Sequence, residues 1–150
     1  MPYLAILGFA LLLWFYWLRH SCLVILRTKA PHDHARQVAQ ANHLSFPEVL
    51  DRLQARPSGQ GLRELHQGLL DDYRILTCLL RYTAAFQARG YRYQQFLLAM
   101  DFRLMQLSFR LTRRLAPSAA RRALQENAQI LAHLANWLAE RAQRSLAARA

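Results

Sequence analysis

The most apolar part of the chain is its first stretch of sequence. Residues 3–18 hold no charged side chain, and after Arg19 and His20 the apolar pattern resumes at residues 23–26. A membrane-spanning helix needs about 20 apolar residues, and one continuous helix over residues 3–26 would be about 36 Å long. We therefore predict a transmembrane anchor within residues 1–29. The alternative is a helix buried in a protein core.

The residues that flank this apolar segment predict its orientation. Trp14 and Trp17 lie toward one end of it, as in the aromatic belt of a membrane interface, and Arg19, Arg27 and Lys29 all follow. Because basic residues favour the cytoplasmic side, we expect a single-pass protein of a bacterial inner (cytoplasmic) membrane. Its N-terminus would lie outside and residues 30–150 in the cytoplasm. A cleaved signal peptide fits less well, since no small-x-small site follows the apolar run.

Arg19 is open to two interpretations. If the bilayer ends near Trp17, the Arg19 side chain reaches the lipid headgroups, and we favour this interpretation. If the span continues to Leu26, Arg19 and His20 lie within the membrane and need a partner. The second interpretation would make the helix part of a larger membrane complex.

Residues 30–61 predict a juxtamembrane linker with one short helix. The first part is polar, and His32 and His34 stand beside Asp33. No Cys or Glu completes these residues at the spacing of a metal site. A solvated linker or a short helix is therefore favoured over a metal site.

The short helix is predicted to start at Ser45. Ser45 can cap the helix, Glu48 can close a capping box, and Pro47 suits the first turn. We expect the helix to continue to about Arg56, because residues 57–61 read PSGQG and form a break.

Residues 62–150 predict three longer helices. Apolar residues recur at intervals of three and four over Leu62–Arg89, Tyr93–Leu115 and residues 119–148. Gly90 suits the C-terminal end of the first helix. The second helix is apolar over roughly two-thirds of its circumference, more than two neighbours are expected to cover. The predicted fold is all-α: an N-terminal single transmembrane helix, a short helix, and a basic cytoplasmic bundle of about three longer helices.

Asp101 is the outstanding polar residue of the second long helix. It lies between two apolar stripes, in line with Ser108 and Thr112. A carboxylate in so apolar an arc is costly unless it is paired. We favour a buried Asp–Arg pair that fixes the register of the helices. A ligand or proton site is the alternative, although no second carboxylate stands at a spacing that would build an acid–base pair.

The composition and the absence of catalytic motifs argue against an enzyme. The 150 residues hold 20 Lys and Arg but only 9 Asp and Glu, so the net charge is +11. Phosphate-binding loops, zinc-protease motifs, haem-attachment motifs and serine elbows are absent from the sequence. Cys22 and Cys78 lack the neighbours that activate a thiolate. We therefore expect no catalytic residues, no metal and no cofactor.

Two sets of residues predict binding surfaces. Arginines alternate with aromatic residues after the first long helix, and this partner-binding set comprises Tyr82, Phe86, Arg89, Tyr91, Arg92 and Tyr93. Arginines also flank Pro117, and this basic surface comprises Arg110, Arg113, Arg114, Arg121 and Arg122. Arginine beside aromatic rings suits protein partners, anionic lipid headgroups and nucleic acid.

The sequence favours a non-enzymatic membrane-anchored accessory or scaffold subunit. We expect residues 3–26 to contact the lipid bilayer, and the cytoplasmic domain to bind a membrane protein complex or a second copy. The alternative is a membrane-tethered binder of anionic lipid or nucleic acid, with nucleic acid the least favoured. In general plan the chain resembles the small single-pass accessory subunits of bacterial membrane complexes, an analogy of architecture and not of motif.

Overall fold

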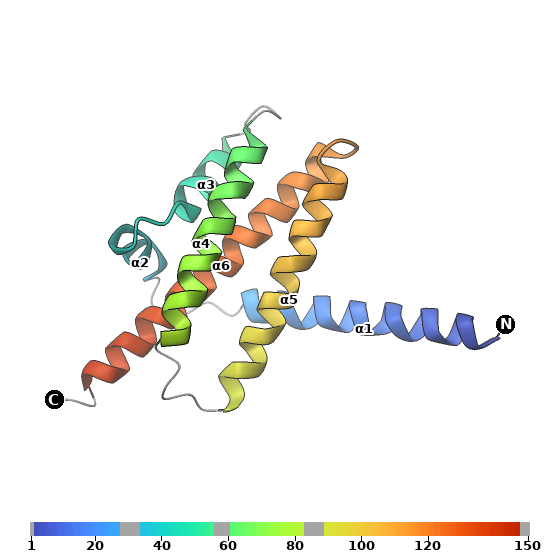
Figure 1. The fold of residues 1–150 in the computed structure, drawn as a ribbon, viewed down its shortest axis with the longest axis horizontal. Coiled ribbons are helices and arrows are strands. Elements are labelled where there is room, and N and C mark those ends of the chain that lie inside the picture. The colour runs from blue at the N-terminus through green and yellow to red at the C-terminus, as the bar shows by residue number, and fades with distance from the viewer. Residues whose placement is uncertain (1, 28–33, 56–60, 83–88, 148–150) are drawn as a thin grey trace.

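The described part of the chain is helical and contains no strand. The computed structural model describes residues 2–27, 34–55, 61–82 and 89–147. These hold six helices: α1 (Pro2–Arg27), α2 (Ala35–Ala41), α3 (Phe46–Gln54), α4 (Leu62–Tyr82), α5 (Arg89–Thr112) and α6 (Pro117–Ala147) (Figure 1). The all-helical class predicted from the sequence is therefore confirmed for these residues.

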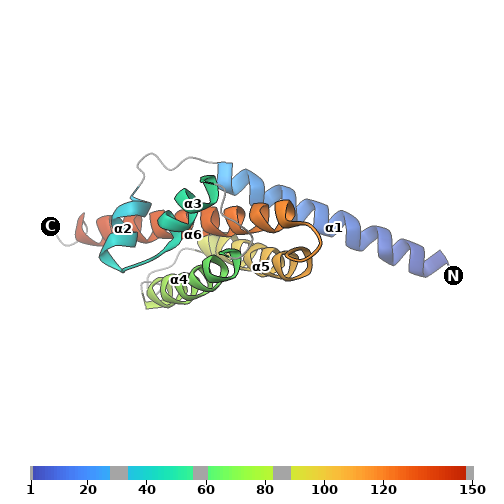
Figure 2. The same ribbon diagram turned by 90° about the horizontal axis from the view of Figure 1, so that it is seen from above.

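The longest helix, α6, forms the centre of the fold, and the other five helices all pack against it. Its inward face alternates large and small residues, with Leu124, Ala128, Leu131 and Ala135 fully buried. The alanines let neighbouring helices approach closely, and the leucines fill the remaining space. Figure 2 shows α4 and α5 on one side of α6 and α3 on the other. We refer to α2–α6 together as the helical body.

The segment over residues 30–61 contributes more to the core than a linker would. It holds two helices, and Ala35 and Ala39 of α2 and Phe46 and Val49 of α3 are buried in the same core as α4, α5 and α6. The sequence favours a linker here because α2 is short and polar on its outer face. The buried Ala35 and Ala39 lie one turn apart on the face of α2 that packs against α6.

Ser45 lies at the N-cap of α3, but the predicted capping box is wrong. The Ser45 side chain makes no capping hydrogen bond within α3. The backbone N–H and the hydroxyl of Ser45 both donate to Asp72 Oδ2, at 2.8 and 3.0 Å. Glu48 pairs instead with Arg52, at 2.7 Å. The buried carboxylate of Asp72 on α4 therefore accepts the hydrogen bonds of Ser45 at the N-terminal end of α3.

The predicted end of the first long helix also needs correction. Within the described residues α4 ends at Tyr82, and α5 already begins at Arg89. Gly90 therefore lies in the first turn of α5 and is not a helix C-cap. The segment 83–88, over which the sequence predicts continued helix, lies outside the described residues.

The N-terminal helix α1 divides into a first half that is exposed all round and a second half with one buried face. From Tyr3 to Trp17 its large apolar side chains are all exposed, whereas Leu18 is 1% and Cys22 0% exposed. In Figures 1 and 2 the first half projects away from the helical body and the second half lies against it. The length and composition of α1 are sufficient to cross a membrane. The change from exposed to buried falls between Trp17 and Leu18.

Candidate functional site

The junction between α1 and the helical body contains an ion-pair cluster. Arg19 on α1 donates from Nη2 to Glu126 Oε2 of α6 at 2.7 Å, and from Nη1 to Glu126 Oε1. The same Nη1 also donates to Asp101 Oδ1 of α5 at 3.1 Å. One guanidinium therefore joins three helices. Its two-pronged contact with Glu126 is the strong form of an arginine–carboxylate pair.

Apolar contacts close around this cluster. Leu18 and Cys22 of α1 pack on Leu97 of α5 in a small core of their own, and Ile25 bridges it to the main core. The Cys22 thiol donates weakly to the Leu97 carbonyl oxygen at 3.5 Å. Leu18, Cys22 and Ile25 follow one another at intervals of four and three residues along α1, so they share one face of that helix. Arg19 is held at the edge of that face by packing as well as by charge.

The cluster carries one arginine against two carboxylates, and the two acids differ. The Asp101 side chain is fully buried, while that of Glu126 is 12% exposed. Burial raises the pKa of Asp101, the charge of Arg19 opposes this change, and the charge of Glu126 adds to it. Among the described atoms Asp101 Oδ2 has no hydrogen-bond partner. Glu126 is thus the principal ionic partner of Arg19, and Asp101 is the weaker one.

The position of Arg19 limits the part of α1 that is free to enter a membrane. As a whole α1 has 26 residues, about 39 Å at 1.5 Å per residue. Its exposed part, Tyr3–Trp17, is only about 22 Å long by the same rise. In this structure Arg19 turns to carboxylates of its own chain, which neither sequence-based interpretation of this residue included.

The predicted partner-binding set is only partly described. Tyr82, at the end of α4, is 82% exposed, and Tyr93, in the first turns of α5, is 53% exposed. Ile75, which lies seven residues before Tyr82 on the same side of α4, is also exposed. Phe86 and the side chains of Arg89, Tyr91 and Arg92 lie outside the described residues, so the prediction that the set forms one surface is not tested by the structure.

The predicted basic surface spans the turn between α5 and α6. Arg110, Arg113, Arg114 and Arg122 are exposed, and Arg121 is half-buried. The sequence between Arg89 and Arg122 holds a single acid, the buried Asp101. The exposed side chains of this region therefore carry positive charge without compensation from acids of the same segment.

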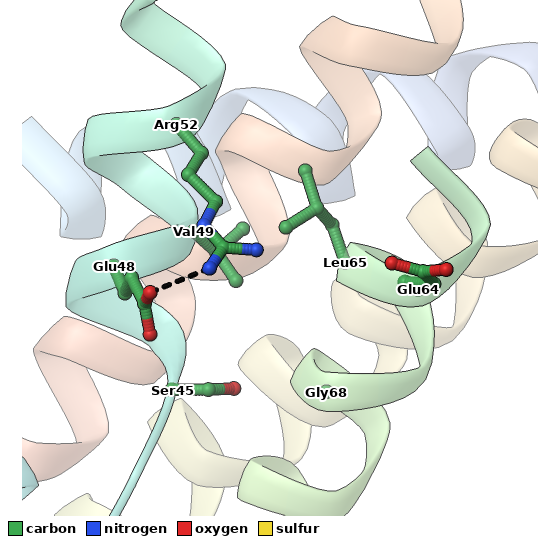
Figure 3. A pocket seen from close by; sticks show the side chains of 7 residues that line it. All are labelled: Ser45, Glu48, Val49, Arg52, Glu64, Leu65 and Gly68. Atoms are coloured by element: carbon green, nitrogen blue, oxygen red, sulfur yellow. Dashed lines mark hydrogen bonds and ion pairs between the residues drawn. The ribbon is translucent and has the colours of Figure 1, made fainter. Parts of the chain in front are cut away.

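A shallow pocket lies between α3 and α4 (Figure 3). It is lined by Ser45, Glu48, Val49, Arg52, Glu64, Leu65 and Gly68. Figure 3 shows the Glu48–Arg52 ion pair along one wall and Glu64 on the other. Both partners of that pair are largely exposed, so the pair has little effect on stability.

Glu126 is a residue of the ion-pair cluster around Arg19 that was not predicted from the sequence. Glu126 follows Ala123 by three residues and precedes Ile130 by four, and both of these are buried. A carboxylate on the apolar face of α6 is the signal that could have found it. Across the described ranges, no three His, Cys, Asp or Glu side chains gather to hold a metal ion.

Comparison with protein-family models, with curated proteins and with solved structures gives no match to this chain.

Proposed function

We propose that the chain is a non-enzymatic membrane-anchored accessory or scaffold subunit that assembles with a membrane protein complex. The observation that carries this proposal is the attachment of α1. Arg19 and Leu18 attach α1 to α5 and α6, so we expect the apolar half of α1 and the helical body to move as one unit. A rigid attachment would give the helical body one orientation relative to the bilayer. Docking on a membrane protein complex requires a fixed orientation, whereas an enzyme tethered to the membrane by a flexible linker does not.

The orientation that we propose has the N-terminus outside and the helical body in the cytoplasm of a bacterium. It is supported by Arg27, exposed at the end of α1, and by Lys29 beyond it, since basic residues favour the cytoplasmic side. A reporter fused after Ala150 should therefore behave as cytoplasmic. Alkaline phosphatase activity from such a fusion would show the opposite orientation. Extraction of the chain from membranes by carbonate would show that α1 is not a membrane anchor.

The docking site that we propose for a protein partner includes Tyr82 and Phe86. Large exposed aromatic side chains are the usual anchors of protein interfaces, and Tyr82 is among the most exposed of this chain. The test is co-purification in mild detergent from native membranes, followed by mass spectrometry. The Tyr82→Ala/Phe86→Ala variant should lose the partner, while Leu146→Ala, an exposed apolar change on α6, should keep it.

Two results would contradict this proposal. One is a monodisperse monomer that carries no other protein in mild detergent. The other is partner binding at wild-type affinity by the Tyr82→Ala/Phe86→Ala variant, with helicity unchanged by circular dichroism. The second result would reject the docking site and leave the scaffold role in place.

The exposed arginines support one alternative, a membrane-tethered binder of anionic lipid or nucleic acid. The dependence of binding affinity on salt concentration distinguishes nucleic-acid binding from the scaffold function. A protein that neutralises several phosphates loses nucleic-acid affinity steeply as salt rises, whereas a largely apolar protein interface survives moderate salt. Salt-sensitive retention of nucleic acid by the purified full chain would favour the alternative.

A further inference from the structure

The outer face of α5 is apolar and basic at the same time. Phe96, Leu107 and Leu111 are 57%, 54% and 65% exposed, although they are large apolar side chains. Arg103 and Arg110 are exposed between them. At 100° per residue, these five side chains lie within one half of the helix circumference. We call this set, together with Arg114, the outer face of α5.

The outer face points in the direction in which α1 projects. The opposite face of α5 is buried, and there Phe102 stacks on Tyr73 of α4 with ring centroids 4.0 Å apart. Phe109 stacks in the same way on His66 of α4, at 4.4 Å. In both views of the molecule α4 lies on the far side of α5 from the free end of α1 (Figures 1 and 2). The side turned away from α4 therefore faces the same way as the exposed half of α1.

The length of the exposed part of α1 can be compared with the thickness of a bilayer. The free part of α1 is about 22 Å long, whereas the hydrocarbon core of a bilayer is about 30 Å thick. An amphipathic helix at a membrane surface lies about 5–10 Å deep, at the boundary of headgroups and acyl chains. If α5 lies at that depth, the free part of α1 and the immersed face of α5 together match the hydrocarbon thickness.

We propose that the outer face of α5 is a lipid-binding surface that seats the helical body on a bilayer of anionic lipids. Phe96, Leu107 and Leu111 enter the boundary region, and Arg103, Arg110 and Arg114 bind the phosphate groups of the headgroups. This inference rests on the proposed membrane anchor and adds the surface that the body presents to the membrane.

Charge favours anionic lipid over a protein as the occupant of this face. Arg103 and Arg110 lie seven residues apart on the same side of α5 as the apolar residues, and Arg114 lies in the turn that follows α5. Arginine can lay its methylene stem along apolar groups while the guanidinium reaches phosphate. The face is also turned to the side on which the exposed half of α1 projects, so insertion of α1 would bring it close to the membrane.

The experiment measures the depth of a nitroxide label on the full chain in vesicles. The label is attached at Leu107→Cys in a Cys78→Ser background, and the vesicles contain phosphatidylcholine with or without phosphatidylglycerol. The matched control is a label at Gln40→Cys on α2, which lies far from the free end of α1 (Figure 1). In anionic vesicles the label at Leu107 should be reached by oxygen and protected from a nickel chelate, and the label at Gln40 should show the reverse.

The charge requirement is tested by the Arg103→Gln/Arg110→Gln/Arg114→Gln variant. Each arginine lost should reduce the ratio of immersed to aqueous label by about fivefold, because a basic residue near an anionic surface adds about 1 kcal/mol. The control variant Arg63→Gln/Arg74→Gln/Arg81→Gln removes the same charge from exposed positions of α4 and should keep the label at Leu107 immersed.

Three outcomes would overturn the proposal in different ways. A water-exposed label at Leu107 in a chain that resists carbonate extraction rejects the lipid-binding face and leaves the anchor and the scaffold function intact. Shielding of Leu107 only after a soluble protein is added assigns the face to that protein. Release of the chain by carbonate rejects the anchor, and with it both proposals.

Discussion

Arg19 and Glu126 form a two-pronged ion pair across 107 positions of the sequence. The pair joins the only apolar helix of the described chain that is long enough to cross a membrane to the central helix α6. Without it α1 would be attached to the helical body by the Arg19–Asp101 contact and by packing around Leu18, Cys22 and Ile25. The same pair lies where the exposed part of α1 ends, so it links the stability of the fold to the placement of the proposed membrane anchor.

Removal of Arg19 should destabilise the helical body strongly. In Arg19→Met two carboxylates remain at the junction, one of them fully buried, and the free energy of unfolding should fall by about 3 kcal/mol. Urea unfolding in mild detergent, followed by circular dichroism, measures this change. The Arg27→Met variant, at an exposed position of α1, is the control and should change the free energy by less than about 0.5 kcal/mol.

An apolar replacement of the whole cluster should recover most of that loss. In Arg19→Met/Asp101→Leu/Glu126→Met no uncompensated charge remains, and such replacements of buried ion clusters are often neutral or stabilising. If the triple variant is as unstable as Arg19→Met alone, the packing of α1 and not the ion pair controls stability at the junction.

The two acids of the cluster should respond differently to neutralisation. Asp101→Asn keeps an oxygen for Arg19 Nη1 and removes a carboxylate whose pKa burial raises, so it should cost less than about 1 kcal/mol at neutral pH. Glu126→Gln breaks the two-pronged contact and should cost about 2 kcal/mol. The measurement is again the free energy of unfolding. A larger loss for Asp101→Asn than for Glu126→Gln would reverse the assignment of the principal partner.

Apolar periodicity predicted the elements of this fold better than the contacts between them. The spacing of leucines predicted the three longer helices, because residues on a buried face repeat every three or four positions. The sequence also predicted that Asp101 is buried beside an arginine. It could not identify Arg19 as that partner, because Arg19 lies 82 positions away, in a segment that its composition assigns to the membrane.

The same limit explains the wrong capping box at Ser45. A capping box is a local pattern, and the Ser45-to-Glu48 spacing satisfies it. The actual acceptor, Asp72, is 27 positions away and reaches Ser45 only because α3 and α4 pack together. Pairwise partners that are distant in sequence depend on tertiary packing, which periodicity does not encode.

Stability should fall as the pH falls below about 6.5, the pKa of histidine in an unfolded chain. Burial lowers the pKa of His66, which stacks on Phe109, and the nearby charges of Arg110 and Arg113 lower it further. Burial also lowers the pKa of His133, and Glu140 opposes that change. Both histidines therefore stay neutral in the folded chain at a pH where the unfolded chain binds protons, so acid favours unfolding.

The slope attributable to each histidine cannot exceed about 1.4 kcal/mol per pH unit. His66→Phe should flatten the dependence below about pH 6.5, since the ring stack is kept and the titrating group is lost. Measurements near pH 8, where the histidine is neutral in both states, give the cost of the substitution itself. An unchanged slope in His66→Phe would show that this imidazole takes up its proton equally well in the folded and unfolded chain.

The contact between α3 and α4 should make the effect of Gly68→Ala depend on Ser45. In the middle of a helix this change is usually stabilising by about 1 kcal/mol. Here a Cβ at position 68 would lie 2.8 Å from Ser45 Oγ, the atom that donates to Asp72. The hydroxyl would have to move and weaken a hydrogen bond to a buried carboxylate, at a cost of about 1.5–3 kcal/mol. Gly68→Ala should therefore destabilise the otherwise unchanged chain.

In Ser45→Ala the hydroxyl is absent and the nearest remaining side-chain atom, the Cβ of residue 45, lies at 3.7 Å, an ordinary contact. In that background Gly68→Ala should stabilise, and a double-mutant cycle of unfolding free energies measures the change of sign. Stabilisation in both backgrounds would mean that the two helices separate readily and that the Ser45–Asp72 contact does not hold them at this distance. Destabilisation in both would mean that the Ser45 hydroxyl is not the group that resists the added Cβ.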